Sequence, residues 1–324
     1  MKFNHLILGA ALFAAATPSF GSSLIDGYNV VVFNSFNANN SDSNVPIAIG
    51  GNATTSSYAF YQSNNSSVSG GYGTVVGGNL NMTYGNGPSP VTYVGGTATL
   101  KSTSCNTGCV QSGGPSPVNF GVLQNQMLNE SSYLSNLSTN GTVASQYSGL
   151  FFNANTTGQS LYIFDINASQ LTSGYSYLNF VGTGNATVLV NVNGSIASGS
   201  SIVNGGFQGT SGSNVLFNFY NASQITVSSF DASVLAPYAT VYGNNGQFDG
   251  SLVAENFSGT SSADEFHSDD AFAGILPTSP NLNDPPAGSV PTPTPEPDAG
   301  YLTAGGILLG LGFGLRRFCR GGRS

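Results

Sequence analysis

Short apolar runs followed by paired glycines recur along the first third of the chain. Three such runs, Ile47–Ile49, Val75–Val76 and Tyr93–Val94, each precede two glycines and a second short strand. The paired glycines are Gly50 and Gly51, Gly77 and Gly78, and Gly95 and Gly96. Glycine allows a tight corner, and a repeat of 18 to 27 residues with one corner per circuit is typical of a solenoid. The pattern predicts an all-β solenoid whose glycines form corners, because none of them continues as a phosphate-binding loop.

One segment, residues 119–138, interrupts the β-pattern with helical periodicity. Its apolar residues recur on one helix face: Leu123, Met127, Leu134 and Leu137. An end near Asn140 and Gly141 is expected, because glycine commonly terminates helices. We expect one amphipathic helix that packs along the side of the solenoid. The alternative is a helix that binds a partner.

Alternating strands return after this segment and continue to about Pro277. Alternation predicts inward side chains at Val188, Val190, Val192, Val215, Phe217 and Phe219. We therefore expect one folded domain over residues 22–277, which is long enough to bury a single large core.

The N-terminus has the pattern of a secretory signal peptide. Lys2 precedes an apolar run from Leu6 to Ala16, and the small residues Ala14–Ala16 offer a cleavage site. We expect residues 1–21 to be this signal, so that the protein is exported. The alternative is an N-terminal membrane anchor.

The C-terminus combines a proline-rich linker, an uncharged run and a basic end. The linker covers residues 278–297, and the run Ala299–Leu315 would span roughly 25 Å as a helix. We expect a C-terminal transmembrane helix within an anchor segment, residues 298–324. The arginines that follow should stay cytoplasmic, which leaves the domain outside. The alternative is a buried helix of a soluble domain.

This tail resembles the PEP-CTERM sorting signal of exopolysaccharide-producing Gram-negative bacteria. The resemblance is carried by Pro295, Glu296 and Pro297, by the apolar run, and by Arg316 with Arg317. It implies that an exosortase, a membrane transpeptidase-like enzyme, recognises and processes the tail. The protein would be anchored in the inner membrane and would reach the cell surface or extracellular matrix after processing.

Charge excludes one class of partner. Between Ser22 and Pro297 the only lysine or arginine is Lys101, against thirteen acidic residues, which leaves a net charge near −12. Nucleic acids and anionic lipids are bound through clustered basic side chains, which this region lacks. We therefore expect no nucleic-acid partner.

The cysteines predict one small covalent loop. Cys105 and Cys109 enclose three residues, and an exported chain would join them as a disulfide. A metal site is disfavoured at this pair, since no second pair of ligands follows.

An acidic cluster surrounds His267 near the end of the domain. Its carboxylates are Asp264, Glu265, Asp269 and Asp270. Three interpretations remain open: a solvated cap, a calcium site, or a pair of catalytic carboxylates of a glycosidase. Apart from this calcium hypothesis, no cofactor is expected.

Several stretches resemble the choice-of-anchor A family of bacterial surface domains. They are Tyr28–Val30, the three glycine-pair strands, Leu235–Ala239, Phe248–Ala254, Glu265–His267 and Phe272–Gly274. The resemblance covers residues 24–277, although Ser43–Pro46 replaces the acidic-Gly-Arg turn that family members carry before the first glycine pair. The closing coils are also similar to ice-binding β-solenoid adhesins. These resemblances imply a right-handed parallel β-helix with one helix alongside and an adhesive role, with Glu265 and His267 among the motif positions.

These features favour an exported structural or adhesive protein over an enzyme. Its partners would be exopolysaccharide or neighbouring cells in a biofilm, contacted through amide, hydroxyl and tyrosine groups. The first alternative is a polysaccharide-active β-helix enzyme, for which only Lys101 and His267 supply basic groups. The second is an ice-binding protein, which needs a regular threonine array; Thr97 and Thr99 form one short step of such an array.

Overall fold

The computed structural model describes residues 25, 27–60, 68, 71–86, 92–104, 109–172, 174–197, 200, 202, 206–259, 264–267 and 270–281, with the backbone alone at 264 and 265. The chain divides into two compact units, residues 1–286 and 287–324, and every described residue belongs to the first. In the described part, no helix combines the length and apolarity needed to cross a membrane. The predicted signal peptide and membrane anchor lie outside the described residues, as does most of the predicted linker.

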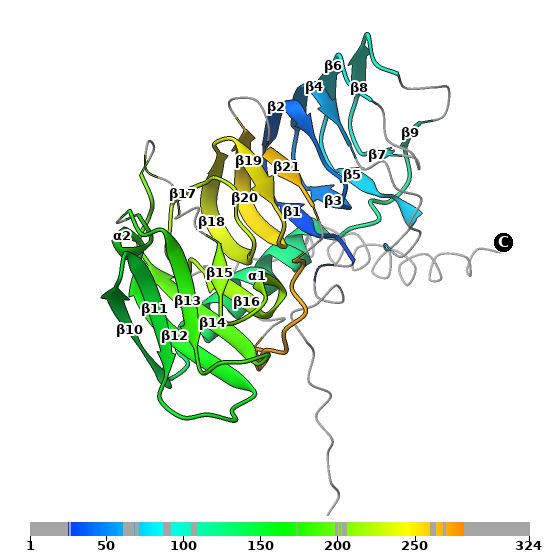
Figure 1. Cartoon of the computed structure of the whole chain (residues 1–324). Coiled ribbons are helices and arrows are strands. Elements are labelled where there is room, and N and C mark those ends of the chain that lie inside the picture. The colour runs from blue at the N-terminus through cyan, green and yellow to red at the C-terminus, as the bar shows by residue number, and fades with distance from the viewer. Residues whose placement is uncertain are drawn as a thin grey trace, which may run out of the picture. The chain divides into compact units, whose positions relative to one another are not determined.

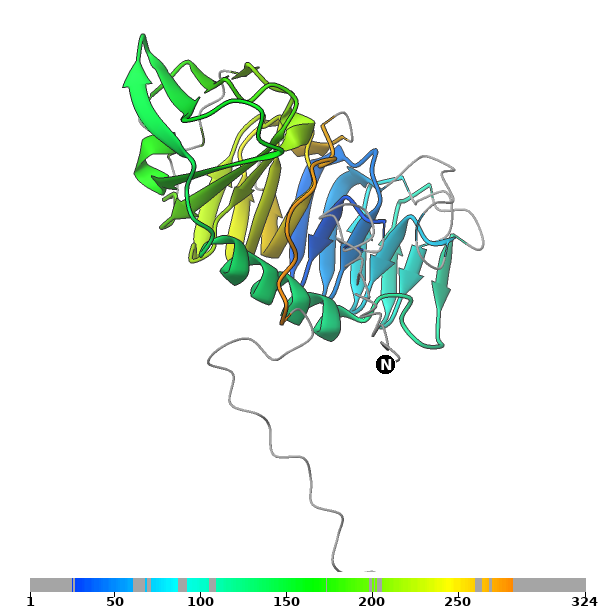
Figure 2. The ribbon, with the colours of Figure 1, turned by 90° about the horizontal axis from the view of Figure 1, so that it is seen from below.

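Most strands stack as parallel coils around a shared interior (Figure 1). The glycine-pair strands lie directly above one another: Ile47 pairs with Thr74, and Thr74 pairs with Thr92. The prediction of an all-β, solenoid-like fold from recurring glycine corners is confirmed. A single long helix, α1 (Phe120–Leu134), runs along one side of the stack (Figure 2).

Beneath α1 lies a parallel sheet that we call the helix-covered face. Its strands, in spatial order, are β12 (Leu161–Asn167), β14 (Thr187–Asn193), β16 (Val215–Asn218), β18 (Ser233–Gly243), β20 (Leu252–Gly259), β1 (Val30–Val32), β3 (Ile47–Ile49), β5 (Thr74–Val76), β7 (Thr92–Val94) and β9 (Val110–Ser112). Most of these strands have apolar residues on both sides, because one side meets the interior and the other meets α1.

The remaining strands form the other sides of the coils. The long strands β18 and β20 bend around a corner, where they are joined by β17 (Gln224–Val227), β2 (Phe36–Asp42), β4 (Ala53–Ala59), β6 (Leu80–Thr83) and β8 (Ala98–Lys101). Two smaller sheets contain β10 (Gly141–Gln146), β11 (Gly149–Ala154), β13 (Tyr177–Val181) and β15 (Phe207–Gln208), and β19 (Gly246–Phe248) with β21 (Asp264–Phe266). Short helical turns occur at α2 (Ala168–Leu171) and η2 (Gly212–Asn214).

The spatial order of the coils differs from their order in the chain. The first strand, β1, lies in the middle of the stack, between β3 and the late strand β20. The first set of coils grows away from β1 in one direction, and α1 then carries the chain back past β1 to begin the second set. Fifteen helical residues span about 22 Å, which corresponds to four or five strand spacings of about 4.8 Å. The sequence pattern did not predict that β1 lies in the middle of the stack or that α1 leads the chain back past it.

Each glycine corner is required by close approach of two backbones. A Cβ atom at Gly77 would clash with the carbonyl oxygen of Gly50, and one at Gly95 would clash with that of Gly77. The residue after each pair adds a ladder of amide bonds: Asn52 Oδ1 accepts from the Asn79 N–H, and Asn79 Oδ1 accepts from the Thr97 N–H, both at 2.8 Å. Glycine allows the backbones of adjacent coils to approach each other closely. The asparagine side chain accepts hydrogen bonds from the backbone N–H groups that have no strand partner at the corner.

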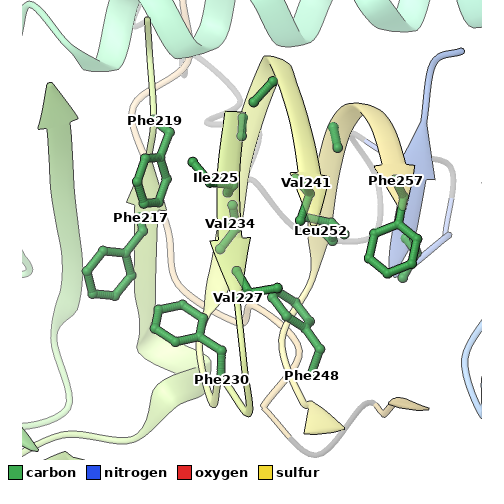
Figure 3. Close-up of a cluster of buried hydrophobic side chains, with 14 of the residues drawn as sticks. Phe217, Phe219, Ile225, Val227, Phe230, Val234, Val241, Phe248, Leu252 and Phe257 are labelled. Carbon is green, nitrogen blue, oxygen red and sulfur yellow. The ribbon is translucent and has the colours of Figure 1, made fainter. Parts of the chain in front are cut away.

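Aromatic and aliphatic side chains fill the interior, and Figure 3 shows part of this cluster, including Phe217, Phe230 and Phe248. Successive ring pairs lie 4.7 to 6.1 Å apart through Phe152, Phe180, Phe207, Phe230 and Phe248. The inward positions predicted in the second set of coils are confirmed, since all of them belong to this interior cluster. Burying one such ring stabilises the fold by about 1.5 to 3 kcal/mol, before the contribution of ring–ring contact.

Helix α1 packs its predicted apolar face on the sheet but is shorter than predicted. Leu123, Met127 and Leu134 are buried, and Leu137 packs beyond the last turn. The helix begins after Asn119, whose Oδ1 accepts the Val122 N–H at 3.2 Å, and it ends at Leu134. Side chains of Ser135 and Asn136 bond back to the Ser132 carbonyl at 2.8 and 2.7 Å. Such side-chain bonds to the helix backbone weaken its last turn.

Candidate functional site

Outward side chains of β2, β4, β6 and β8 form a continuous polar surface, which we call the polar face. Along each strand, buried apolar residues such as Phe36 and Leu80 alternate with exposed polar ones. One outward column contains Ser258, Asn37, Thr54, Asn81 and Thr99, and the next contains Asn39, Ser56, Thr83 and Lys101. The glycine-pair pattern predicted the strands β4, β6 and β8, but it predicted neither β2, whose residues are mostly polar, nor these columns, because the coils differ in length.

The chemistry of the polar face is hydrogen bonding without strong charge. Neighbours in a column lie one strand spacing apart, about 4.8 Å, and successive outward residues of a strand lie about 6.6 Å apart. Lys101 is the single charged residue of the two columns and stands at their edge. Such a grid can donate and accept many hydrogen bonds at once.

Threonine does not dominate the grid. Thr54, Thr83 and Thr99 point outward from three successive strands, but they fall in two columns and alternate with asparagine and serine. Thr97, predicted to form a step with Thr99, lies at the glycine corner and donates its N–H to Asn79.

The predicted acidic site is described only in part. Asp269 and the side chains of Asp264 and Glu265 lie outside the described residues, so the calcium hypothesis stays a prediction. Asp270 accepts the Ser213 N–H at 3.1 Å and the Ser211 hydroxyl at 3.2 Å. Across the residues with described side chains, no group of three or more His, Cys, Asp or Glu could hold a metal ion.

Asp270 approaches carboxylates that the sequence did not connect to it. Burial raises the pKa of Asp231, and the nearby charges of Asp249 and Asp270 raise it further. The three residues follow strands of different coils, so only the coil register brings them together. Another motif position, His267, donates its backbone N–H to the Phe248 carbonyl, and its ring nitrogen Nε2 lies 3.3 Å from the Asn44 side-chain amide.

Two further acidic residues lie where α1 packs against its neighbours: Glu130 on the helix itself and Glu255 on β20. Glu130 is buried on the helix, and burial raises its pKa to about 7 although its Oε2 accepts the Ser279 N–H at 2.8 Å. Burial also raises the pKa of Glu255, which accepts a hydrogen bond of 2.7 Å from Gln124 Nε2. Both hydrogen bonds connect α1 to another element. Glu130 joins the helix to the final segment, residues 270–281, and Gln124 joins it to Glu255 of β20.

Of the two cysteines in the predicted disulfide, the structure describes Cys109. Cys109 is disulfide-bonded. Cys105 lies outside the described residues, so the pairing between the two stays a prediction.

A parallel solenoid-like stack with a polar, weakly charged face defines an all-β domain with a broad hydrogen-bonding surface. The chain belongs to the family described as "Putative Ice-binding-like adhesive domain", whose model matches residues 21–268. The matched region contains every strand from β1 to β21. This is a family of adhesive domains and not of enzymes, and an adhesive domain indicates a surface or extracellular location. Neither the curated proteins nor the solved structures gave a significant match.

Proposed function

We propose that this protein is an exported adhesive protein of the cell surface or extracellular matrix, which makes multivalent contact through its polar face. The observation that carries the proposal is the two-column grid of amide and hydroxyl groups on the outward side of β2, β4, β6 and β8. Many weak hydrogen bonds of fixed spacing give adhesion through avidity instead of through one tight pocket. Exopolysaccharide or a neighbouring cell in a biofilm is the proposed partner.

Export and anchoring form the second part of the proposal. A signal peptide (1–21) directs export, the adhesive domain covers 22–277, and a linker (278–297) leads to a transmembrane anchor (298–324). Pro295, Glu296 and Pro297, together with Arg316 and Arg317, would be recognised by an exosortase. The domain itself is proposed to be a right-handed β-helix. The composition of both chain ends supports this arrangement.

Deletion in the producing cell tests the proposal. Loss of the protein should reduce biofilm cohesion and surface attachment, and complementation should restore both. A variant with Thr54→Glu and Asn81→Glu should fail to complement, because it places two like charges in the centre of the grid. The matched control is Thr142→Glu, which changes an exposed strand residue of β10. Normal adhesion of the deletion strain, or cytosolic fractionation of the protein, would refute the proposal.

Ice binding is the second candidate function. The outward positions of Thr54, Thr83 and Thr99 on adjacent parallel strands favour it, and so does the family description. Thermal hysteresis and crystal shaping by the purified chain test it. Activity that survives Thr83→Val but is lost in Thr83→Lys would support an ice-contacting face, while absence of both effects in the wild type would exclude it.

A further inference from the structure

A groove of about 680 Å³ runs along the corner where the polar face ends. One wall is a column of four residues from successive coils: Asn40, Ser57, Tyr84 and Ser102. Two residues further along the chain, Asp42, Asn86 and Ser104 also line the groove, and the Ser104 hydroxyl donates to Asn86 Oδ1 at 2.5 Å. The groove therefore crosses the strands and follows the direction in which the coils stack.

Repeated left-handed backbone conformation produces this corner. The four residues of the first wall have φ values of 52°, 50°, 52° and 51°. A left-handed residue interrupts the extended backbone of a strand, and four of them in register place this interruption along one line, where the groove lies. Asparagine tolerates this conformation, but a bulky tyrosine in it is unusual and costs about 1 to 2 kcal/mol.

Tyr84 is the residue in this column that packing does not explain. Its side chain is 63% exposed, so the ring gains little from burial to offset the backbone cost. Strained residues of this kind concentrate at binding sites, where the conformation positions a group for a ligand. The left-handed turn places the Tyr84 ring at the groove, where its face is available for stacking.

The chemistry of the walls selects the class of ligand. Asn40, Asn86 and the serines donate and accept hydrogen bonds, and Asp42 is the single ionisable group besides the tyrosines. With no basic side chain lining it, the groove repels phosphates and uronic acids. An aromatic face combined with amides and hydroxyls suits a neutral polyol chain, since the ring contacts C–H groups while the polar side chains contact hydroxyls.

We propose that this groove binds a neutral polysaccharide chain lying across the coils, with Tyr84 stacking on one sugar ring. The coil spacing of about 4.8 Å is close to the length of one sugar unit in an extended chain, so successive units would meet equivalent wall positions. The proposal rests on the proposed adhesive function and gives it a specific site and ligand class.

The test uses the full chain, extracted in mild detergent, in affinity electrophoresis through gels that contain a neutral β-glucan, galactomannan or dextran, with alginate as the anionic comparison. The wild type should be retarded by at least one neutral polymer and not by alginate. Tyr84→Gly should bind about tenfold more weakly, because the stacking ring is lost. Glycine favours the left-handed backbone, so this variant should keep or raise thermal stability. Tyr84→Phe, which keeps the ring, should bind nearly as the wild type does.

Tyr147→Gly is the matched control. Tyr147 is also exposed, at 84%, and also left-handed, with φ of 46°, but it lies in the turn between β10 and β11. Equal binding by Tyr84→Gly and the wild type would overturn the groove as the site and leave the adhesive function standing. Binding to alginate alone, or to none of the polymers, would overturn the neutral ligand class. Failure of the adhesive function itself would appear separately, as normal adhesion of the deletion strain.

Discussion

The first set of coils, β1 to β9, and the second set, β12 to β20, meet the same helix, but one column of their outward residues changes from apolar to polar along the stack. One outward column of the helix-covered face runs through Val31, Ala48 and Val75 in the first set. The same column continues in register through β20 and β18 to Asn218, Asn191 and Asp165 in the second set. The apolar part packs against the first turns of α1, and the polar part meets its end.

Hydrogen bonds explain why the column changes character. Asn218 Nδ2 donates to the Ser131 carbonyl at 2.9 Å, the Ser131 hydroxyl donates to Asn218 Oδ1 at 2.6 Å, and Asn191 Nδ2 donates to the Leu134 carbonyl at 3.0 Å. The last carbonyls of a helix have no partner within the helix and need donors when they are buried. The comparison teaches that apolar contact stabilises the docked helix, while the asparagines define where it ends.

The largest expected effect breaks the first set of coils. Gly77→Val should lower the free energy of unfolding by about 4 kcal/mol or prevent folding, because the new side chain meets the Gly50 backbone. Gly121→Ala is the control: it lies in α1, and its Cβ would meet only Asn119 Oδ1 at 3.8 Å. That substitution should stabilise the protein by about 0.5 to 1 kcal/mol. Urea unfolding of both variants measures the contrast, and equal stabilities would contradict the close-approach argument.

A slightly smaller effect is expected in the second set. Asn218→Ala should cost about 3 kcal/mol, since Asn191 and the Ser131 carbonyl and hydroxyl lose buried partners. A triple variant, Asn218→Leu, Asn191→Leu and Ser131→Ala, removes all three hydrogen-bonding side chains and imitates the apolar part of the column. It should recover part of the stability that Asn218→Ala loses. Hydrogen exchange at the end of α1 should nevertheless be faster in the triple variant. An end as protected as in the wild type would show that the asparagines do not define it.

The raised pKa of Glu130 should make the free energy of unfolding depend on pH. Because the pKa is about 7 in the folded protein and 4.5 is its ordinary value, the folded protein retains a proton that the unfolded chain releases. Stability from this group is therefore fully present below about pH 4.5 and is lost as pH rises through about 7, by about 3 kcal/mol in all. Denaturant titrations across this window measure the slope, with Glu130→Gln as the control. Identical slopes in the two proteins would contradict the assignment.

The smallest effect concerns the two ends of the stack. Antiparallel β10 covers the edge of β11 in the second set, whereas β8 pairs only with β6 among the described strands. Lysine on an edge strand discourages pairing with another chain, and Lys101 lies on β8. Lys101→Thr should leave the unfolding free energy within about 0.5 kcal/mol but increase self-association, measured by light scattering. An unchanged association state would remove this role for Lys101.

Local patterns predicted the elements better than they predicted the arrangement. Glycine corners and alternating valines specify strands because each signal depends on neighbouring residues, and the apolar stripe of α1 is equally local. The position of β1 beside β20 depends on pairing between residues more than 200 positions apart, such as Val30 with Leu252. The groove was missed for the same reason: Asn40, Ser57 and Tyr84 share no sequence motif and become one wall only through coil register.

The central position of β1 has a mechanical consequence. The folded chain starts beside β1, and its last described residues are held at the middle of α1, where Asn129 Nδ2 donates to the Asn281 carbonyl at 3.0 Å. The first strand and the last described residues therefore both lie at the central part of the stack. A pulling force applied at the last described residues acts first on α1 and the central coils. The outermost coils lie away from both of these points, so force applied at the last described residues reaches them only through the central coils.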